Sequence, residues 1–207
     1  MSNIALAAKM IQDCKNINSN YDFYDLVKAH TGNYICRDKY LYWFNWLWEY
    51  IPQEYLYQLY TELLSDIHIL KGRSWYTTFF KPEILSKISK LNKNEIAENS
   101  TLNSLLDNKG FITVYLGHSK KVPHSCNSWA INKENAIDLG RIKTLFDKSN
   151  PVFYCITGKI KLDDIIAHIN VRDRDEIIVL QKNVKNKTKE IFNSADVALK
   201  PEWTYWI

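Results

Sequence analysis

The segment FITVYLGHSKKVPHSCNSWAINKENA, residues 111–136, decides how the second half of the chain is interpreted. It opens with an apolar run between Gly110 and Gly117, which predicts a β-strand. A polar loop with two histidines, one cysteine and three serines follows. Asn132 then stands where an N-cap is expected, with Asn135 at the N3 position, which predicts a short helix. The polar segment therefore either handles a ligand or is a plain loop whose Trp129 fills a core.

Strand and helix patterns extend from this segment to the end of the chain. We expect further strands over PVFYCITGKI (151–160), DEIIVLQKN (175–183) and EWTYWI (202–207), and a helical turn or short helix over LDDIIAHI (162–169). Residues 1–90 instead show apolar side chains at helical spacing. The sequence predicts an α+β protein with a helical, aromatic-rich region over residues 1–100 and an α+β domain over residues 101–207.

The helical region holds most of the seven Trp and thirteen Tyr residues. Its stretch DKYLYWFNWLWEYIPQ predicts a helix that Pro52 ends or kinks. We expect Trp43, Phe44 and Leu47 to pack in a core. The opposite face, with Tyr42, Trp46 and Glu49, is a candidate surface for a partner or for self-association.

Composition places the protein among ordinary soluble globular chains. The net charge of +4 permits contact with nucleic acid without requiring it. The four cysteines are widely spaced and no apolar secretion signal precedes them, so we expect reduced thiols in the cytoplasm. No apolar run is long enough to suggest a membrane span, so no membrane partner is expected.

Three groups of residues outside the opening segment have both a functional and a plain interpretation. Glu176 heads an apolar strand and either protrudes into a cleft or belongs to a solvated charged turn. A zinc site would need His118, His124 and Cys126, with Cys155 or His168 added, but the spacing matches no known ligand pattern. The basic stretch QKNVKNKTKE (181–190) is interpreted as a solvated loop that could contact nucleic acid. The GxGxxG, GxxxxGK[ST], GxSxG and HExxH motifs do not occur.

Taken in order, the motifs resemble those of phage and bacterial proteins with an ADP-ribosyltransferase-like fold. These motifs are VYLG at the first strand, SW with Ala136 in the helix that follows, VFYCITGKIKLDDIIAHI, and RDRDEIIV. The family's corresponding segments are Tyr-Arg-Gly, Ser-Trp-Thr, and Arg-x-Glu-x-Glu before an apolar strand. The resemblance covers about residues 111–181, and an aromatic helical region often precedes the family's motifs as it does here.

The resemblance implies a split β-sheet domain that binds NAD⁺ as a substrate in a cleft between two small sheets. Glu176 matches the family's catalytic glutamate and Ser128 its motif serine, which shapes the nicotinamide pocket. Trp129 matches the Trp beside that serine and Tyr115 the first-strand tyrosine, so both are expected to contribute to cofactor binding. The implied activity is mono-ADP-ribosylation of a macromolecular target, which would be a host protein in the host cytoplasm if the chain is phage-encoded.

The chain departs from the family's motifs at two positions. Leu116 replaces the arginine that anchors the dinucleotide, and leucine cannot make the charge-assisted contacts to phosphate. His118 would point to the same side of an extended strand and could replace the arginine, unless the strand turns at Gly117. Arg174 stands at the upstream acidic position of the glutamate motif, where a cation cannot act as a general base. It could instead contact an acidic acceptor or a nucleic-acid phosphate.

These departures leave three functional hypotheses. The first is an active NAD⁺-dependent ADP-ribosyltransferase. The second is a catalytically degenerate protein of the same fold that acts as a binding or inhibitor protein, as Leu116 and Arg174 favour. The third is a nucleic-acid-binding module, from the mild positive charge and the lysine-rich stretch.

Overall fold

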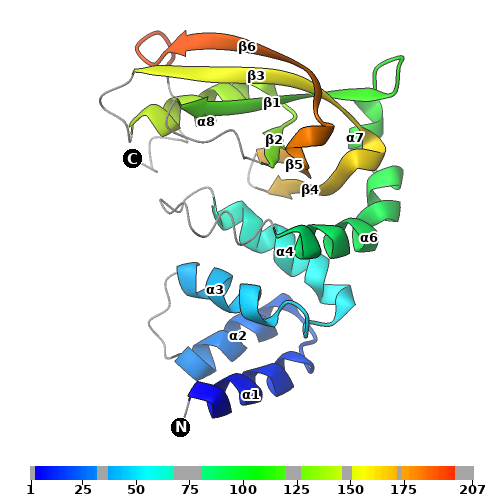
Figure 1. Ribbon diagram of the computed structural model, residues 1–207, viewed down its shortest axis with the longest axis vertical. Helices are drawn as coiled ribbons and strands as arrows, with labels where there is room; N and C mark the ends of the chain where they lie inside the picture. The colour runs from blue at the N-terminus through cyan, green and yellow to red at the C-terminus, as the bar shows by residue number, and fades with distance from the viewer. Residues whose placement is uncertain are drawn as a thin grey trace. The chain divides into compact units, whose positions relative to one another are not determined.

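The computed structural model describes residues 3–31, 37–67, 81–119, 127–145, 151–171 and 174–198. The chain divides into two compact units, Met1–Leu91 and Asn92–Ile207. Helices build the first unit, and the second contains an antiparallel sheet (Figure 1). The predicted order, a helical region followed by a mixed α and β region, is therefore confirmed.

The first unit is formed by helices whose apolar stripes face one another. Phe44 packs edge-on against Phe23 with ring centroids 6.3 Å apart, and the Tyr60 ring lies 6.1 Å from the Phe44 ring. All three side chains are fully buried, as expected for aromatic residues that dominate a small core. The helices are α1 (Asn3–Cys14), α2 (Asn20–Thr31), α3 (Arg37–Leu47), α4 (Gln53–Ile67) and α6 (Pro82–Glu98), which extends into the second unit.

Helix α3 has the two faces that its sequence predicts. Phe44 and Leu47 are buried, whereas Trp43 is only partly buried. On the opposite face Tyr42 is 41% and Trp46 62% exposed. The helix stops before Pro52, and α4 begins directly after it.

The strands among the described residues of the second unit form one six-stranded sheet with the order β4-β5-β2-β1-β3-β6. All the pairs are antiparallel, and β1 pairs with β2 at the single position Tyr115–Ala130. The sheet thus consists of two three-stranded halves, β4-β5-β2 and β1-β3-β6, with a short joint. The strands are β1 (Phe111–Ser119), β2 (Ser128–Ala130), β3 (Val152–Lys161), β4 (Ile165–Val171), β5 (Arg174–Val179) and β6 (Lys185–Asn193).

Helix α8 (Lys133–Leu145) packs closely on one face of this sheet. Asn132 caps it, because its Oδ1 accepts a hydrogen bond from the Glu134 N–H at 2.7 Å. Two glycines make the close approach possible. A Cβ atom on Gly117 of β1 would lie 1.6 Å from the Ala136 carbonyl oxygen, and one on Gly140 would lie 2.5 Å from the Phe153 ring. We call the side of the sheet that α8 covers the α8 face, and the other side the reverse face.

Three sequence interpretations are wrong. The helical turn or short helix expected over 162–169 is limited to a 3-10 turn over Leu162–Asp164, and Ile165–Val171 forms strand β4 instead. Its isoleucines favour a strand, but a short apolar run buried on both sides has no diagnostic period.

The lysine-rich stretch continues into β6 rather than forming a loop, with its side chains largely exposed at the sheet edge. Ser128 and Trp129 lie in a strand, β2, rather than in a loop. The strand expected over 202–207 lies outside the described residues.

Candidate functional site

Ser128 and Glu176 meet in a direct, buried hydrogen bond. The Ser128 hydroxyl donates to Glu176 Oε2 at 2.5 Å, and the two residues are 48 positions apart in the chain. Ser128 is 5% and Glu176 3% exposed. A solvated charged turn, one of the two interpretations considered for Glu176, is therefore wrong. Contacts between a hydroxyl and a carboxylate strengthen in such water-poor surroundings.

The pairing of β2 with β5 places these two side chains on one face. Ser128 is opposite Ile178 and Ala130 is opposite Glu176, so Ser128 and Glu176 are diagonal neighbours. Backbone hydrogen bonds hold the two strands together at both ends. The Val179 N–H donates to the Asn127 carbonyl at 2.8 Å, and the Ile131 N–H donates to the Asp175 carbonyl at 2.9 Å. The alternation of Glu176 and Ile178 against Ile177, expected from the sequence, is confirmed by this register.

Tyr115 lies on the same face as Glu176. The pairs Tyr115–Ala130 and Ala130–Glu176 form a row across β1, β2 and β5. The Tyr115 ring is half-buried and packs against the cluster of Ala130, Ala136 and Cys155. Ala130 is thus the residue between Tyr115 and Glu176 in this row.

Leu116 and His118 lie on the reverse face. Strand β1 runs through Ser119, so it does not turn at Gly117, and Leu116 and His118 share a side as the sequence predicts. Both are buried. The His118 ring lies 5.2 Å from the Tyr154 ring, and its Nδ1 is 2.8 Å from the Ser119 carbonyl oxygen. The structure does not bring His118 to the face that carries Ser128 and Glu176.

Trp129 also points to the reverse face and is fully buried. A Cβ atom added to Gly158 would lie 3.6 Å from the Trp129 ring, so the indole fills space beside β3. Its Nε1–H has no acceptor among the described residues. Trp129 is therefore a core residue directly behind the Ser128–Glu176 contact.

Several sequence candidates fall partly or wholly outside the described residues. The backbone of Arg174 begins β5 opposite Val171, but its side chain is not described. His124 and Cys126 lie outside the described ranges. Within those ranges, no group of three or more His, Cys, Asp or Glu side chains is arranged to hold a metal ion.

Cys155 lies near the site but is not suited to nucleophilic chemistry. Burial raises the pKa of its thiol to about 11, with a smaller contribution from Glu190. Near neutral pH the thiol therefore stays protonated, and only a thiolate reacts readily. Glu190 accepts hydrogen bonds from Lys133 Nζ at 2.7 and 2.9 Å, and this contact raises the pKa of Lys133. Both belong to an ion pair that connects α8 to β6.

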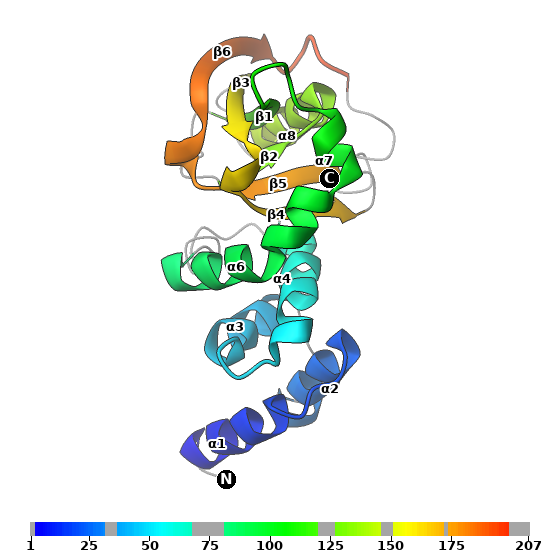
Figure 2. The same ribbon diagram turned by 90° about the vertical axis from the view of Figure 1, so that its right-hand side faces the viewer.

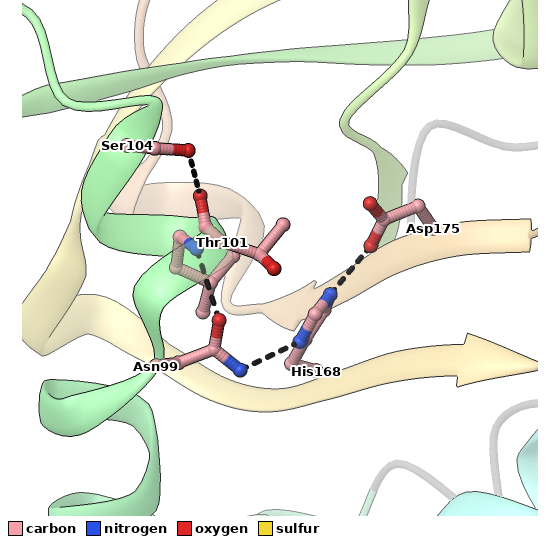
Figure 3. A network of polar contacts seen from close by, with 6 residues as sticks. Asn99, Thr101, Ser104, His168 and Asp175 are labelled. Atoms are coloured by element: carbon pink, nitrogen blue, oxygen red, sulfur yellow. Dashed lines mark hydrogen bonds and ion pairs between the residues drawn. The ribbon is translucent and has the colours of Figure 1, made fainter.

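On the reverse face of β5, the structure reveals a polar network that the sequence did not predict (Figure 3). His168 of β4 lies between Asp175 of β5, at 2.5 Å, and Asn99, at 3.2 Å. Asn99 caps α7 (Ser100–Ser104) by accepting a hydrogen bond from the Leu102 N–H at 3.0 Å. From the sequence, His168 is a candidate only as a metal ligand. No local signal identifies the network, because it depends on the register of β4 against β5.

Comparison with protein-family models, curated proteins and solved structures finds no significant match to this chain. In the described part of the chain, no helix combines the length and apolar character that a membrane crossing requires. The functional proposal therefore rests on the short motifs of this chain and on the geometry of the residues in them.

Proposed function

We propose that this protein is an NAD⁺-dependent mono-ADP-ribosyltransferase that modifies a macromolecular acceptor, with Glu176 as its catalytic carboxylate. The observation that carries the proposal is the 2.5 Å hydrogen bond from Ser128 to Glu176. The two residues belong to separate short motifs of the sequence. Although they are 48 positions apart in the chain, the two side chains are in contact, as they must be to form one site for nicotinamide and ribose.

The proposed reaction breaks one glycosidic bond and forms another. The bond between ribose C1′ and the nicotinamide nitrogen breaks, and neutral nicotinamide leaves with the electron pair. Positive charge develops on the ribose, which passes through an oxocarbenium-like state. A nucleophile of the acceptor then bonds to C1′ and releases its proton to solvent. If water is the nucleophile, the same steps hydrolyse NAD⁺.

Glu176 favours this reaction because its negative charge interacts most strongly with the transition state. Interactions that grow as charge develops accelerate the chemical step, whereas equal binding of substrate and transition state does not. The Ser128 hydroxyl holds one carboxylate oxygen and fixes the direction of the group. Burial of both residues lowers the local dielectric and strengthens the attraction between carboxylate and ribose.

The sheet also supports the proposal. The resemblance implies a cleft between two small sheets, and this sheet consists of two three-stranded halves joined at Tyr115–Ala130. Tyr115, at the motif position expected to contribute to NAD⁺ binding, lies at that joint beside Ala130. We assign no phosphate-binding role to His118, because it is buried on the reverse face.

The proposal is tested by nicotinamide release and label transfer. Purified protein is incubated with NAD⁺ labelled on its adenosine half, with and without a cell lysate. We expect nicotinamide release and a labelled macromolecule, and we expect both to disappear in Glu176→Gln. Glu95→Gln, which changes an exposed carboxylate of α6, is the matched control and should retain both activities. Full activity in Glu176→Gln would refute the proposal.

A second candidate function is a binding or inhibitor protein without turnover. The observation that favours it is the burial of Leu116, at the position where the family has a phosphate-binding arginine. This candidate predicts no NAD⁺ binding by calorimetry. It also predicts association with a macromolecule through the exposed face of α3, which Trp46→Ser would weaken.

A further inference from the structure

The network of Asn99, His168 and Asp175 lies directly behind the residue proposed as catalytic. Asp175 precedes Glu176 in β5, and consecutive strand residues point to opposite faces. His168 pairs across the β4–β5 ladder with Ile177 and therefore lies on the same face as Asp175. The contact that fixes Asp175 is thus made on the reverse face, while Glu176 meets Ser128 on the α8 face.

The capping of α7 determines which atoms donate in this network (Figure 3). Asn99 Oδ1 accepts from the Leu102 N–H, so the amide nitrogen Nδ2 must face His168. Because an amide nitrogen only donates, His168 Nδ1 is the acceptor and the ring carries its proton on Nε2. That proton is donated to Asp175 Oδ1 at 2.5 Å. One neutral tautomer of His168 therefore satisfies the helix cap, the imidazole and the carboxylate together.

Both nitrogens of the His168 ring are engaged, so the ring is not available as a general acid or base. The side chain of His168 is only 8% exposed, and that of Asp175 is 31% exposed. The network is suited to holding its strand in place. It ties β5, through Asp175, to β4 and to the cap of α7.

We propose that Asn99, His168 and Asp175 are positioning residues that orient β5 so that Glu176 faces Ser128. The role in catalysis rests on the proposed transferase function. The underlying geometric claim does not, because it concerns only the direction of the Glu176 carboxylate. Small displacements of a catalytic group reduce the rate strongly, so the support behind Glu176 matters for the chemical step.

The first test compares two variants of His168 by steady-state kinetics of nicotinamide release. Glutamine keeps an N–H that can reach Asp175, whereas leucine keeps the bulk and removes both contacts. We expect His168→Leu to lower kcat about 10- to 100-fold, with KM for NAD⁺ changed by less than about threefold. His168→Gln should restore most of kcat. Equal kcat values for wild type and His168→Leu would overturn the proposal.

The second test needs no substrate. Protein labelled with ¹³C-glutamate reports the side-chain carboxyl resonance of Glu176, which Glu176→Gln assigns by its disappearance. Ser128→Ala marks the resonance position when the hydroxyl contact is lost. We expect His168→Leu to move the Glu176 resonance toward that position, and His168→Gln to leave it at the wild-type position. A resonance that stays at the wild-type position in folded His168→Leu would show that the network only stabilises the fold and would overturn the proposal.

Asn99→Asp provides a variant that keeps the helix cap. Aspartate is as good an N-cap as asparagine, but its second oxygen cannot donate to His168 Nδ1. We expect the ¹⁵N resonances of the His168 ring to change from the Nε2–H tautomer to the doubly protonated form, and the Glu176 resonance to shift with them. Unchanged ring resonances would contradict the assigned hydrogen bonds. If wild type releases no nicotinamide, the transferase function fails, while these resonances still decide the positioning role.

Discussion

The two faces of strand β5 satisfy their polar groups in different ways. On the α8 face, Glu176 is almost fully buried and receives a hydroxyl hydrogen bond from Ser128. On the reverse face, Asp175 is partly exposed and receives the imidazole N–H of a neutral histidine. Burying a carboxylate costs free energy, which the contacts of the buried group must offset. Under the proposed function, Glu176 takes part in chemistry on the α8 face, and the contact of His168 with Asp175 supports it from the reverse face. Replacing Glu176 should then affect stability less than replacing His168.

The largest expected effect is on the α8 face. Glu176→Met replaces the buried carboxylate with an apolar side chain of similar size. We expect nicotinamide release to fall at least about 100-fold, because the charge that stabilises the transition state is lost. The free energy of unfolding should change by less than about 1 kcal/mol, because the desolvation cost of the carboxylate is removed together with its contacts. Urea unfolding measures the free energy of unfolding. The comparison variant on the reverse face is His168→Leu, for which we expect a loss of about 1–3 kcal/mol. Equal destabilisation by both changes would remove the distinction between the faces.

A second change disturbs the α8 face through its covering helix. A Cβ atom on Gly117 would overlap the Ala136 carbonyl, so Gly117→Ala must displace α8 or β1. We expect a loss of about 3 kcal/mol in the free energy of unfolding. Gly110→Ala is the control, since it has open space around it but a φ of +75° and should lose only about 1–2 kcal/mol. A smaller loss at Gly117 than at Gly110 would contradict the close packing of α8.

Ser128→Ala should have an intermediate effect. The variant removes the hydroxyl that holds Glu176 but keeps the carboxylate itself. We expect kcat for nicotinamide release to fall about tenfold, less than for Glu176→Met, because only the orientation of the charge is affected. Ser128→Thr keeps a hydroxyl and is the matched comparison. A loss as large as that of Glu176→Met would assign the serine a direct catalytic part.

The smallest expected effect concerns Asp107, a partly buried carboxylate in the segment that connects α7 to β1. The Lys159 ammonium, together with the Phe111 N–H, lowers the pKa of Asp107 from 3.8 to about 2. A carboxyl group whose pKa is lowered by folding stabilises the fold at pH values above its ordinary pKa. This contribution is lost as the pH falls through the lowered pKa. The difference in thermal midpoint between wild type and Asp107→Asn should therefore shrink from pH 4 to pH 2. A difference that is constant over this range would show that the ion pair does not contribute.

The sequence predicted the parts of this protein that have local signals. The strands around Val114, Ile156 and Ile178 were recognised from apolar runs, and α8 from its cap at Asn132. Strand β2 has three residues, which is too short for any period to be visible. Neither β4 nor β6 shows the alternation that predicts a strand, because β4 opens with three consecutive buried apolar residues, Ile165–Ala167, and the first six residues of β6 are polar.

For the candidate site, the sequence predicts the residues but not the contacts between them. Ser128 and Glu176 were selected from short motifs, but their hydrogen bond depends on the register of β2 against β5. The roles of His168 and Asp175 were not predictable, because a strand pairing and a helix cap far along the chain bring them together with Asn99. Pairings of this kind depend on tertiary structure, and no residue spacing encodes them.

The most direct test of the central claim measures NAD⁺ binding and nicotinamide release together in wild type and Glu176→Gln. If Glu176 acts on the transition state, calorimetry should give dissociation constants within about threefold of each other, while release should fall at least about 100-fold in the variant. Binding and release that fall together would show that Glu176 only binds the substrate. Release that is unchanged in the variant would contradict the account.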